Sequence, residues 1–144
     1  MKKIERSIVL PYSPAQVYAI VNNVADYPKF VSWCEEAKVI SESHYEMFAS
    51  ITVTKAGIHQ TFKTRNRLSE GKRIEMFLLE GPFKKLDGIW DFQETEEGGC
   101  LVHLEVEFEA SNSLLHATIG PLFSGFSKVM LKSLNKRAQE LYGA

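Results

Sequence analysis

Five stretches between residues 45 and 110 alternate between apolar and polar positions with a period of two. They cover residues 45–54, 58–68, 72–80, 86–94 and 100–110. This alternation is typical of strands that bury one face and expose the other. Turn-forming residues separate the stretches, as at Gly57, Gly71 and Gly81-Pro82. The pattern therefore predicts an antiparallel meander of strands.

The segment before the meander predicts one strand and two short helices. Residues 2–10 form the expected strand. Ser13 and Pro14 follow, and they suit the N-cap and the first position of a helix. A second helix of one turn is expected over residues 26–30, with Asp26 as its cap.

Residues 113–142 show a helical period instead. Their apolar face carries Ile119, Leu122, Phe123, Phe126, Val129, Met130, Leu134 and Leu141. A long amphipathic helix needs an apolar partner, and the concave face of a curved sheet is the only large one that this pattern offers. We therefore expect an α+β fold in which a curved antiparallel sheet of about six to seven strands wraps around the C-terminal helix. No linker divides the chain, so we expect a single domain over residues 1–144.

The composition is that of an ordinary globular protein. The chain has 144 residues, of which 44% are hydrophobic and 24% are charged. No apolar run approaches the ~20 residues that cross a bilayer, and the N-terminus lacks the apolar region of a secretory signal. Cys34 and Cys100 belong to no metal-binding or disulfide motif, which fits a reducing compartment. We therefore expect a cytoplasmic protein.

The charge is unevenly distributed along the chain. A net charge of −1 argues against a domain dedicated to nucleic acid, yet residues 112–144 carry four basic residues and one acidic residue. Clustered cations bind phosphate groups with an affinity that depends on salt. These basic residues could therefore contact ribosomal RNA, lie against an anionic membrane surface or simply face solvent, and charge alone does not distinguish the three. The candidate surface residues are Lys63, Arg65, Arg67, Lys84, Lys85, Lys128, Lys132 and Lys136.

Small or polar residues are expected on the two surfaces that face each other inside the fold. On the sheet they are Ala49, Gln60, Thr64, Asn66 and Gly88, and on the helix Gly120, Ser124, Gly125 and Ser127. They permit either close backbone packing or a cavity for an apolar ligand. The hydrophobic pattern alone does not decide between these two interpretations.

Two segments carry a family resemblance. One is Tyr27-Pro28-Lys29-Phe30-Val31-Ser32-Trp33-Cys34, and the other is the GPFKKLDGIWDF run over residues 81–92. With residues 61–66 and 9–13, they resemble the coenzyme Q-binding, START-like family and, within it, the ribosome association toxins of the RatA group. Ser32 stands where many relatives have proline, which affects the local shape of the loop. The resemblance covers essentially the whole chain.

The resemblance implies a helix-grip fold, in which an antiparallel sheet grips the C-terminal helix around a hydrophobic tunnel. It implies a non-enzymatic protein that binds ubiquinone or a related isoprenoid lipid in support of respiration. The alternative that it implies is a toxin that binds the large ribosomal subunit and blocks its association with the small subunit. No cofactor is required in either role. Peripheral contact with the inner membrane and an antitoxin partner are further options.

The tunnel wall is expected to be apolar, with aromatic rings on which a quinone ring could stack. The predicted lining residues are Phe30, Trp33, Met47, Phe62, Met76, Trp90, Phe92, Leu104, Val106, Phe108, Ile119, Leu122, Phe123, Phe126 and Met130.

Catalytic chemistry finds little support in the sequence. The histidines are His44, His59, His103 and His116, and no pair has the spacing of metal ligands. There is no GxSxG motif, and His103, three residues after Cys100, falls on the opposite face of the same expected strand. We therefore expect no catalytic residue and no metal site. Arg137 falls on the apolar face of the C-terminal helix, which leads us to expect an ion pair with an acidic residue.

Overall fold

A computed structural model describes residues 2–143, apart from the side chain of His116. The strands are β1 (Lys2–Leu10), β2 (Cys34–Glu42), β3 (Glu46–Lys55), β4 (Ile58–Ser69), β5 (Arg73–Glu80), β6 (Phe83–Glu94) and β7 (Cys100–Ala110). The helical elements are α1 (Pro14–Asn22), the 3-10 turn η1 (Val24–Asp26), α2 (Tyr27–Phe30) and α3 (Ser113–Tyr142).

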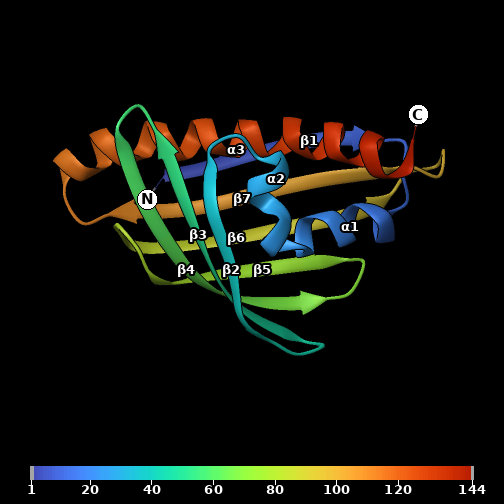
Figure 1. Cartoon of the computed structure of the whole chain (residues 1–144), viewed down its shortest axis with the longest axis horizontal. Coiled ribbons are helices and arrows are strands. Elements are labelled where there is room, and N and C mark those ends of the chain that lie inside the picture. The colour runs from blue at the N-terminus through green and yellow to red at the C-terminus, as the bar shows by residue number, and fades with distance from the viewer. Residues whose placement is uncertain (1, 144) are drawn as a thin grey trace.

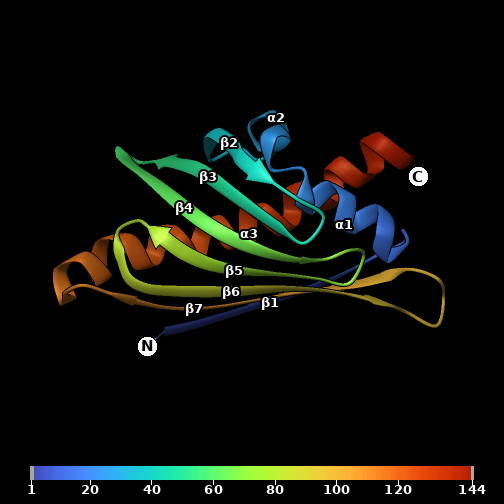
Figure 2. The ribbon, with the colours of Figure 1, turned by 90° about the horizontal axis from the view of Figure 1, so that it is seen from below.

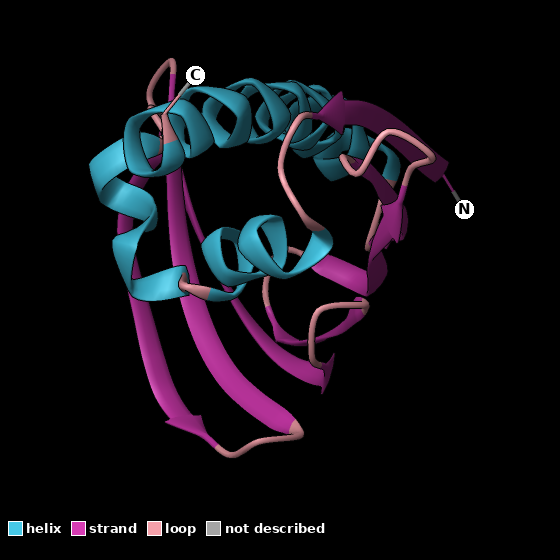
Figure 3. Ribbon diagram, turned by 90° about the vertical axis from the view of Figure 1, so that its right-hand side faces the viewer, coloured by secondary structure: helices cyan, strands magenta, loops and turns pink. Residues whose placement is uncertain are grey.

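The seven strands form one antiparallel sheet in the order β1-β7-β6-β5-β4-β3-β2. The sheet bends around α3, which runs along its concave side (Figures 1 and 2). Seen from one end, α1 lies between the sheet and α3 (Figure 3). The expected α+β fold, a curved sheet of about seven strands around a long C-terminal helix, is thus confirmed.

The helix starts follow from local hydrogen bonding. The Ser13 hydroxyl accepts a hydrogen bond from the Gln16 backbone N–H, and the Gln16 side chain accepts one from the Ser13 N–H. This reciprocal pair satisfies two amide groups that the first turn of α1 leaves without a helical partner. At the start of α3, the Asn112 side chain accepts from the N–H of Leu115 in the same way. Asp26 occupies the N-cap position of α2 as expected, but its side chain makes no capping hydrogen bond, because its carboxylate accepts from Asn23 and pairs with Lys29.

Two strand assignments differ from the pattern-based expectation. β2 has no counterpart in it, because this edge strand has one fully buried residue, Cys34, and shows no long alternation. β6 begins at Phe83, a few residues earlier than expected, and continues past a register shift between Phe83 and Lys85.

The strand register defines rows of side chains across the concave face. One row, here called the inner row, carries Met47, Asn66, Met76, Gly88, Val106 and Ile4 on β3, β4, β5, β6, β7 and β1. Neighbouring members of the row are about 5 Å apart, the spacing between strands. Asn66 is the polar member of a row that is otherwise apolar, and its side chain is buried.

Candidate functional site

A small cavity lies between the concave face of the sheet and α3. Its volume is about 90 Å³, and we call it the inner cavity. The lining residues are Tyr27, Ile51, Phe62, Thr64, Met76, Leu86, Trp90, Leu104, Val106, Phe123, Phe126, Ser127 and Met130. None of them carries a formal charge at neutral pH, so the wall offers apolar contact and a few hydroxyl groups.

Gly88 and Met76 shape the floor of the inner cavity together. A Cβ atom at residue 88 would lie 2.6 Å from the Met76 methyl carbon. Because glycine has no Cβ, the end of the Met76 side chain can occupy this space. A methionine side chain has three rotatable bonds and adapts readily to irregular space. The cavity volume therefore depends on the conformation of Met76.

An aromatic cluster adjoins the inner cavity. Phe83 packs against Phe62, Phe108 and Phe123 with ring centroids 5.9, 5.0 and 5.6 Å apart, and Phe62 and Phe123 also line the cavity. These separations are in the range of favourable ring contacts. The Gly81-Pro82 turn precedes Phe83, and a Cβ at Gly81 would approach Leu78 to 3.0 Å. The absence of a side chain at Gly81 thus lets the turn lie close to Leu78 and to the Phe62 ring.

A charged side chain reaches α3 from the inner face of β1. The Arg6 guanidinium donates hydrogen bonds to the hydroxyls of Ser124 and Ser127, at 3.1 and 3.2 Å. Ser127 in turn lines the inner cavity and donates to the Ser124 carbonyl at 2.6 Å. The small residues expected on this part of the helix therefore serve in part as acceptors for Arg6.

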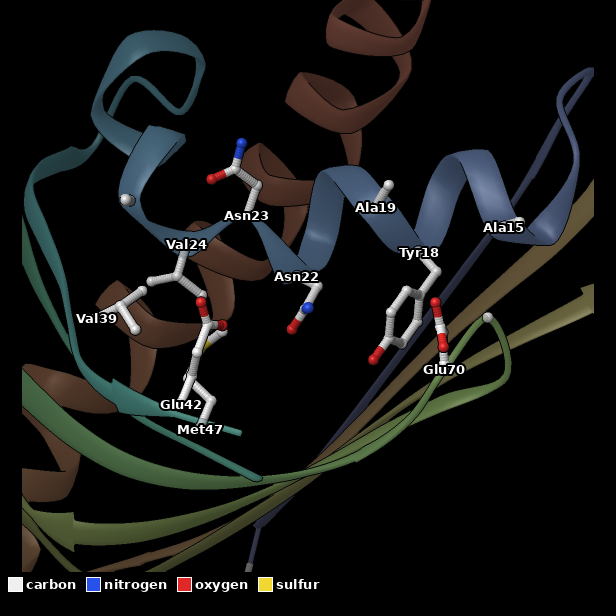
Figure 4. Close-up of a pocket in the computed structure, with 12 residues that line it drawn as sticks. Ala15, Tyr18, Ala19, Asn22, Asn23, Val24, Val39, Glu42, Met47 and Glu70 are labelled. Carbon is white, nitrogen blue, oxygen red and sulfur yellow. The ribbon is translucent and has the colours of Figure 1, made fainter. Parts of the chain in front are cut away.

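A larger cavity of about 610 Å³ lies beneath α1, and we call it the α1 cavity (Figure 4). It is lined by Ala15, Tyr18, Ala19, Asn22, Asn23, Val24, Ala25, Val39, Glu42, Met47, Glu70 and Gly71. Tyr18 and Asn22 point from α1 toward the sheet, and Glu70 rises from the turn between β4 and β5 (Figure 4). Burial, with a smaller contribution from Glu70, raises the pKa of Tyr18.

The structure places about half of the predicted tunnel residues around the inner cavity. Those that line it are Phe62, Met76, Trp90, Leu104, Val106, Phe123, Phe126 and Met130. Phe108, Ile119 and Leu122 are buried behind the wall without lining it, and Phe92 stacks on Trp90 with centroids 6.2 Å apart.

Three predicted tunnel residues lie elsewhere. Phe30 borders two shallow surface hollows beside α2, since the one-turn helix turns it away from the sheet. The edge of the Trp33 indole packs against α3 at Gly125, where a Cβ would come within 2.7 Å of the ring. Met47 lines the α1 cavity, although it stands in the same row as Met76. A shared sheet face therefore does not imply a shared cavity.

Several lining residues were absent from the predicted set. Ile51, Thr64 and Leu86 stand on the alternating faces that the sequence pattern identifies, so they could have been included. Tyr27 could not, because its position depends on the fold of η1 and α2. Its buried hydroxyl donates to the Val21 carbonyl, and burial raises its pKa.

The basic residues divide into paired and unpaired groups. Lys63 lies 3.2 Å from Glu80, Arg65 lies 3.1 Å from Glu46, and Lys85 lies 3.7 Å from Asp87. Within the part of the chain that the structure describes, the ion pairs do not include Arg67, Lys84, Lys128, Lys132 and Lys136. The α3 lysines are exposed on the outer side of the helix. These three lysines, one helical turn apart, form a row of exposed basic residues on α3.

Arg137 makes the ion pair that the sequence predicts. Its guanidinium lies 3.7 Å from Asp26 and 5.3 Å from the centroid of the Phe30 ring. Both partners belong to the segment around α2, so this contact fastens that segment to α3.

The described cysteines are buried, and the possible metal ligands of the described chain do not cluster. Cys34 and Cys100 are buried free cysteines, and burial raises the pKa of Cys34 to about 11. Among the described residues, no three His, Cys, Asp or Glu side chains gather as metal ligands would. No helix within residues 2–143 combines the length and apolar character needed to cross a membrane.

The curved sheet, the long helix that it holds and the apolar space between them define a helix-grip protein of the START type. The sequence matches the family described as "Polyketide cyclase / dehydrase and lipid transport" over residues 10–135. The chain therefore belongs to this family.

Named relatives cover essentially the whole chain. It is 41% identical over 140 residues to the ribosome association toxin RatA of Pseudomonas aeruginosa, with 97% of each sequence covered. It is 26% identical over 141 residues to the mitochondrial coenzyme Q-binding protein COQ10 of Dictyostelium discoideum, covering 94% of this chain and 68% of that protein. The resemblance identified from the sequence motifs is confirmed.

The fold is shared more widely. The ZhuI aromatase/cyclase from Streptomyces sp. R1128 superimposes with a TM-score of 0.88 at 15% sequence identity, covering 96% of this chain and 93% of that one. At this level of identity the likeness concerns the fold alone.

Proposed function

We propose that this protein binds an apolar ligand of the isoprenoid quinone class between its sheet and α3. The observation that carries the proposal is the inner cavity, whose wall is formed by apolar and aromatic side chains from both layers of the fold. Burying apolar surface contributes about 25 cal/mol per Å², so a long hydrocarbon tail can bind there without a charged contact. The family description and the printed name of the COQ10 relative support the same class of ligand.

The size of the inner cavity sets a condition on binding. Its volume of about 90 Å³ is well below the roughly 300–1,000 Å³ of typical small-molecule sites. A quinone therefore requires the lining side chains to move apart. Met76 and Met130 are the flexible members of the wall.

The same wall favours binding over catalysis. Its lining residues include no Asp, Glu, His, Cys, Lys or Arg, the side chains that most often transfer protons or attack substrates. The Tyr27 hydroxyl is committed to the Val21 carbonyl, and burial raises its pKa. We infer that ligand enclosure, rather than a reaction, is the activity of this site.

Tryptophan fluorescence tests the proposal directly, because the two tryptophans differ in position. Trp90 lines the inner cavity, whereas Trp33 lies against Gly125 outside the lining. Titration with decyl-benzoquinone is expected to quench the fluorescence saturably, both in the wild type and in Trp33→Phe. In Trp90→Phe most of the quenching is expected to disappear. Quenching that does not saturate, or that depends equally on both tryptophans, would overturn the proposal.

A second candidate is docking on the large ribosomal subunit through the outer face of α3. The name of the P. aeruginosa relative and the unpaired lysines Lys128, Lys132 and Lys136 favour it. The residues repeat every fourth position, so their Cα atoms advance about 6 Å along the helix from one to the next. Such a row can contact successive phosphate groups and release their counterions.

Sedimentation with purified large subunits tests this candidate. Replacing Lys128, Lys132 and Lys136 by Gln is expected to abolish co-sedimentation at moderate salt and to lower the slope of log K against log salt by roughly 2 to 3. The matched control replaces Lys63 and Lys85 by Gln, since both are already paired with carboxylates. If the control loses as much ribosome binding as the α3 variant, the assignment of binding to α3 is wrong. If the wild type does not bind the large subunit, the candidate function is wrong.

A further inference from the structure

Asn66 is a buried polar side chain whose amide oxygen has no partner. It is 6% exposed, and its amide oxygen has no hydrogen-bond partner in the structure. An unsatisfied buried polar group of this kind costs about 1–3 kcal/mol relative to a satisfied one. Such a group in a folded protein needs an explanation, and an interaction with a ligand is one.

The inner row places Asn66 between the two cavities. Its neighbour on β3 is Met47, which lines the α1 cavity, and its neighbour on β5 is Met76, which lines the inner cavity. The side chains of all three belong to the same face of the sheet. Asn66 itself lines neither cavity, but it lies on the concave face between one lining residue of each, and both of these neighbours are flexible methionines.

A second unpartnered amide oxygen lies across the α1 cavity from the sheet. Asn22 lines this cavity, points from α1 toward the sheet, and its oxygen is buried without a partner (Figure 4). The helix above and the sheet below thus each contribute an amide oxygen that can accept a hydrogen bond.

The remaining polar lining of the α1 cavity is rich in acceptors as well. Glu42 and Glu70 contribute carboxylates, the Tyr18 hydroxyl can accept or donate, and the lining includes no Lys, Arg or His. The nearest basic partner is His44, whose ring lies 3.8 Å from the Glu70 carboxylate, outside the lining. Carboxylates and amide oxygens repel an anionic group and favour one that donates hydrogen bonds.

We propose that the α1 cavity and Asn66 bind the polar end of an amphiphile whose apolar chain occupies the inner cavity, and that this polar end is an uncharged, hydroxyl-bearing ring. The inference rests on the proposed function and specifies its ligand. For a quinone-class molecule it selects the hydroquinone over the quinone, because only the hydroquinone has O–H groups to donate to Asn22 and Asn66. An anionic lipid is disfavoured by the carboxylates.

The test compares the two oxidation states of one probe. Decyl-hydroquinone, kept reduced under nitrogen, and decyl-benzoquinone are titrated into the full-length protein, and affinity is obtained from the increase in Tm with concentration. The wild type is expected to bind the hydroquinone roughly threefold to tenfold more tightly, the effect of one or two hydrogen bonds. Asn66→Leu and, independently, Asn22→Ala are expected to reduce this preference toward unity.

The Tm without probe separates a ligand contact from a structural role. Asn66→Leu is expected to raise it, because an unsatisfied polar group is replaced by an apolar one of similar size. The matched control is Thr52→Val, since Thr52 is also buried but shares a hydrogen bond of 2.9 Å with Thr61. This control is expected to lower the Tm and to leave the probe preference unchanged.

Each outcome bears on a definite claim. Equal binding of both oxidation states, or tighter binding of the quinone, overturns the inference and leaves the proposed function standing. A preference that persists in Asn66→Leu and Asn22→Ala overturns the assignment to these residues. If the wild type binds neither probe, the proposed function fails and the inference falls with it.

Discussion

Two glycines, Gly88 and Gly125, occur where a neighbouring side chain occupies the space that a Cβ atom would need. A Cβ at Gly88 would meet the flexible end of Met76 at 2.6 Å, whereas a Cβ at Gly125 would meet the rigid indole of Trp33 at 2.7 and 2.9 Å. A methionine end can rotate away, but a packed indole ring cannot move without shifting its loop. The two positions therefore have different roles: Gly88 provides space beside the cavity, and Gly125 provides close contact between α3 and the segment before β2.

Gly125→Ala is expected to destabilise the protein by about 1–2 kcal/mol. Overpacking against Trp33 costs about 1–3 kcal/mol, and the better helix propensity of alanine offsets up to about 1 kcal/mol. Urea unfolding of the single and double variants measures the effect. In a Trp33→Ala background the same substitution should become neutral or stabilising, because the clash is gone. An equal cost in both backgrounds would contradict the contact.

The raised pKa of Cys34 predicts a loss of stability in alkaline solution. Burial raises the pKa of the thiol from 9.0 to about 11, so the folded protein keeps a proton that the unfolded chain releases. The stability from this difference is complete below pH 9 and is lost as the pH rises from 9 to 11. Buried Tyr27, whose pKa is also raised, adds to the decline at higher pH.

The measurement is the free energy of unfolding from urea titrations at several pH values. Between neutral pH and the alkaline end of this range, the wild type is expected to lose about 1–2 kcal/mol more than Cys34→Ala does. If the variant and the wild type decline in parallel, the thiol does not contribute.

At the scale of elements, the sequence predicts structure wherever one face is buried along a whole segment. β7 alternates in burial along nearly its whole length, β3 and β4 do so over part of theirs, and α3 begins and ends at the expected residues. β2 escapes the pattern because an edge strand in which mainly Cys34 is buried needs no alternation. Its place is determined by pairing with β3, which is a property of the folded sheet.

The contact between Arg137 and the segment around α2 is expected to contribute modestly to stability. The guanidinium is partly buried, pairs with Asp26 at 3.7 Å and lies over the Phe30 ring. Arg137→Met keeps the apolar stem and removes the charge, so a loss of about 0.5–1.5 kcal/mol is expected.

Thermal unfolding of Arg137→Met, Asp26→Asn and the double variant separates the pair from its parts. A coupling energy between the two substitutions is the expected result. Strict additivity would show that the ion pair contributes nothing.

At the scale of the whole molecule, the site is less predictable than the fold. Alternation identifies the residues on the concave face, among them Phe62, Met76 and Trp90, but not the volume that they leave between them. Met47 and Met76 share the inner row and line different cavities, because residues of α1 close the cavity at Met47 and residues of α3 close the cavity at Met76. The unpartnered oxygens of Asn22 and Asn66 also appear only when the elements are packed together.

The central claim is that the space between the sheet and α3 holds an apolar ligand. Organic extraction and mass spectrometry of the protein, purified without detergent, test it most directly. The comparison is with Val106→Phe, which adds a ring to the cavity wall and whose folding is verified by circular dichroism. We expect an isoprenoid-type molecule in near-stoichiometric amount from the wild type and a large depletion in the variant. Extracts that contain no such molecule, or equal amounts from both proteins, would contradict the claim.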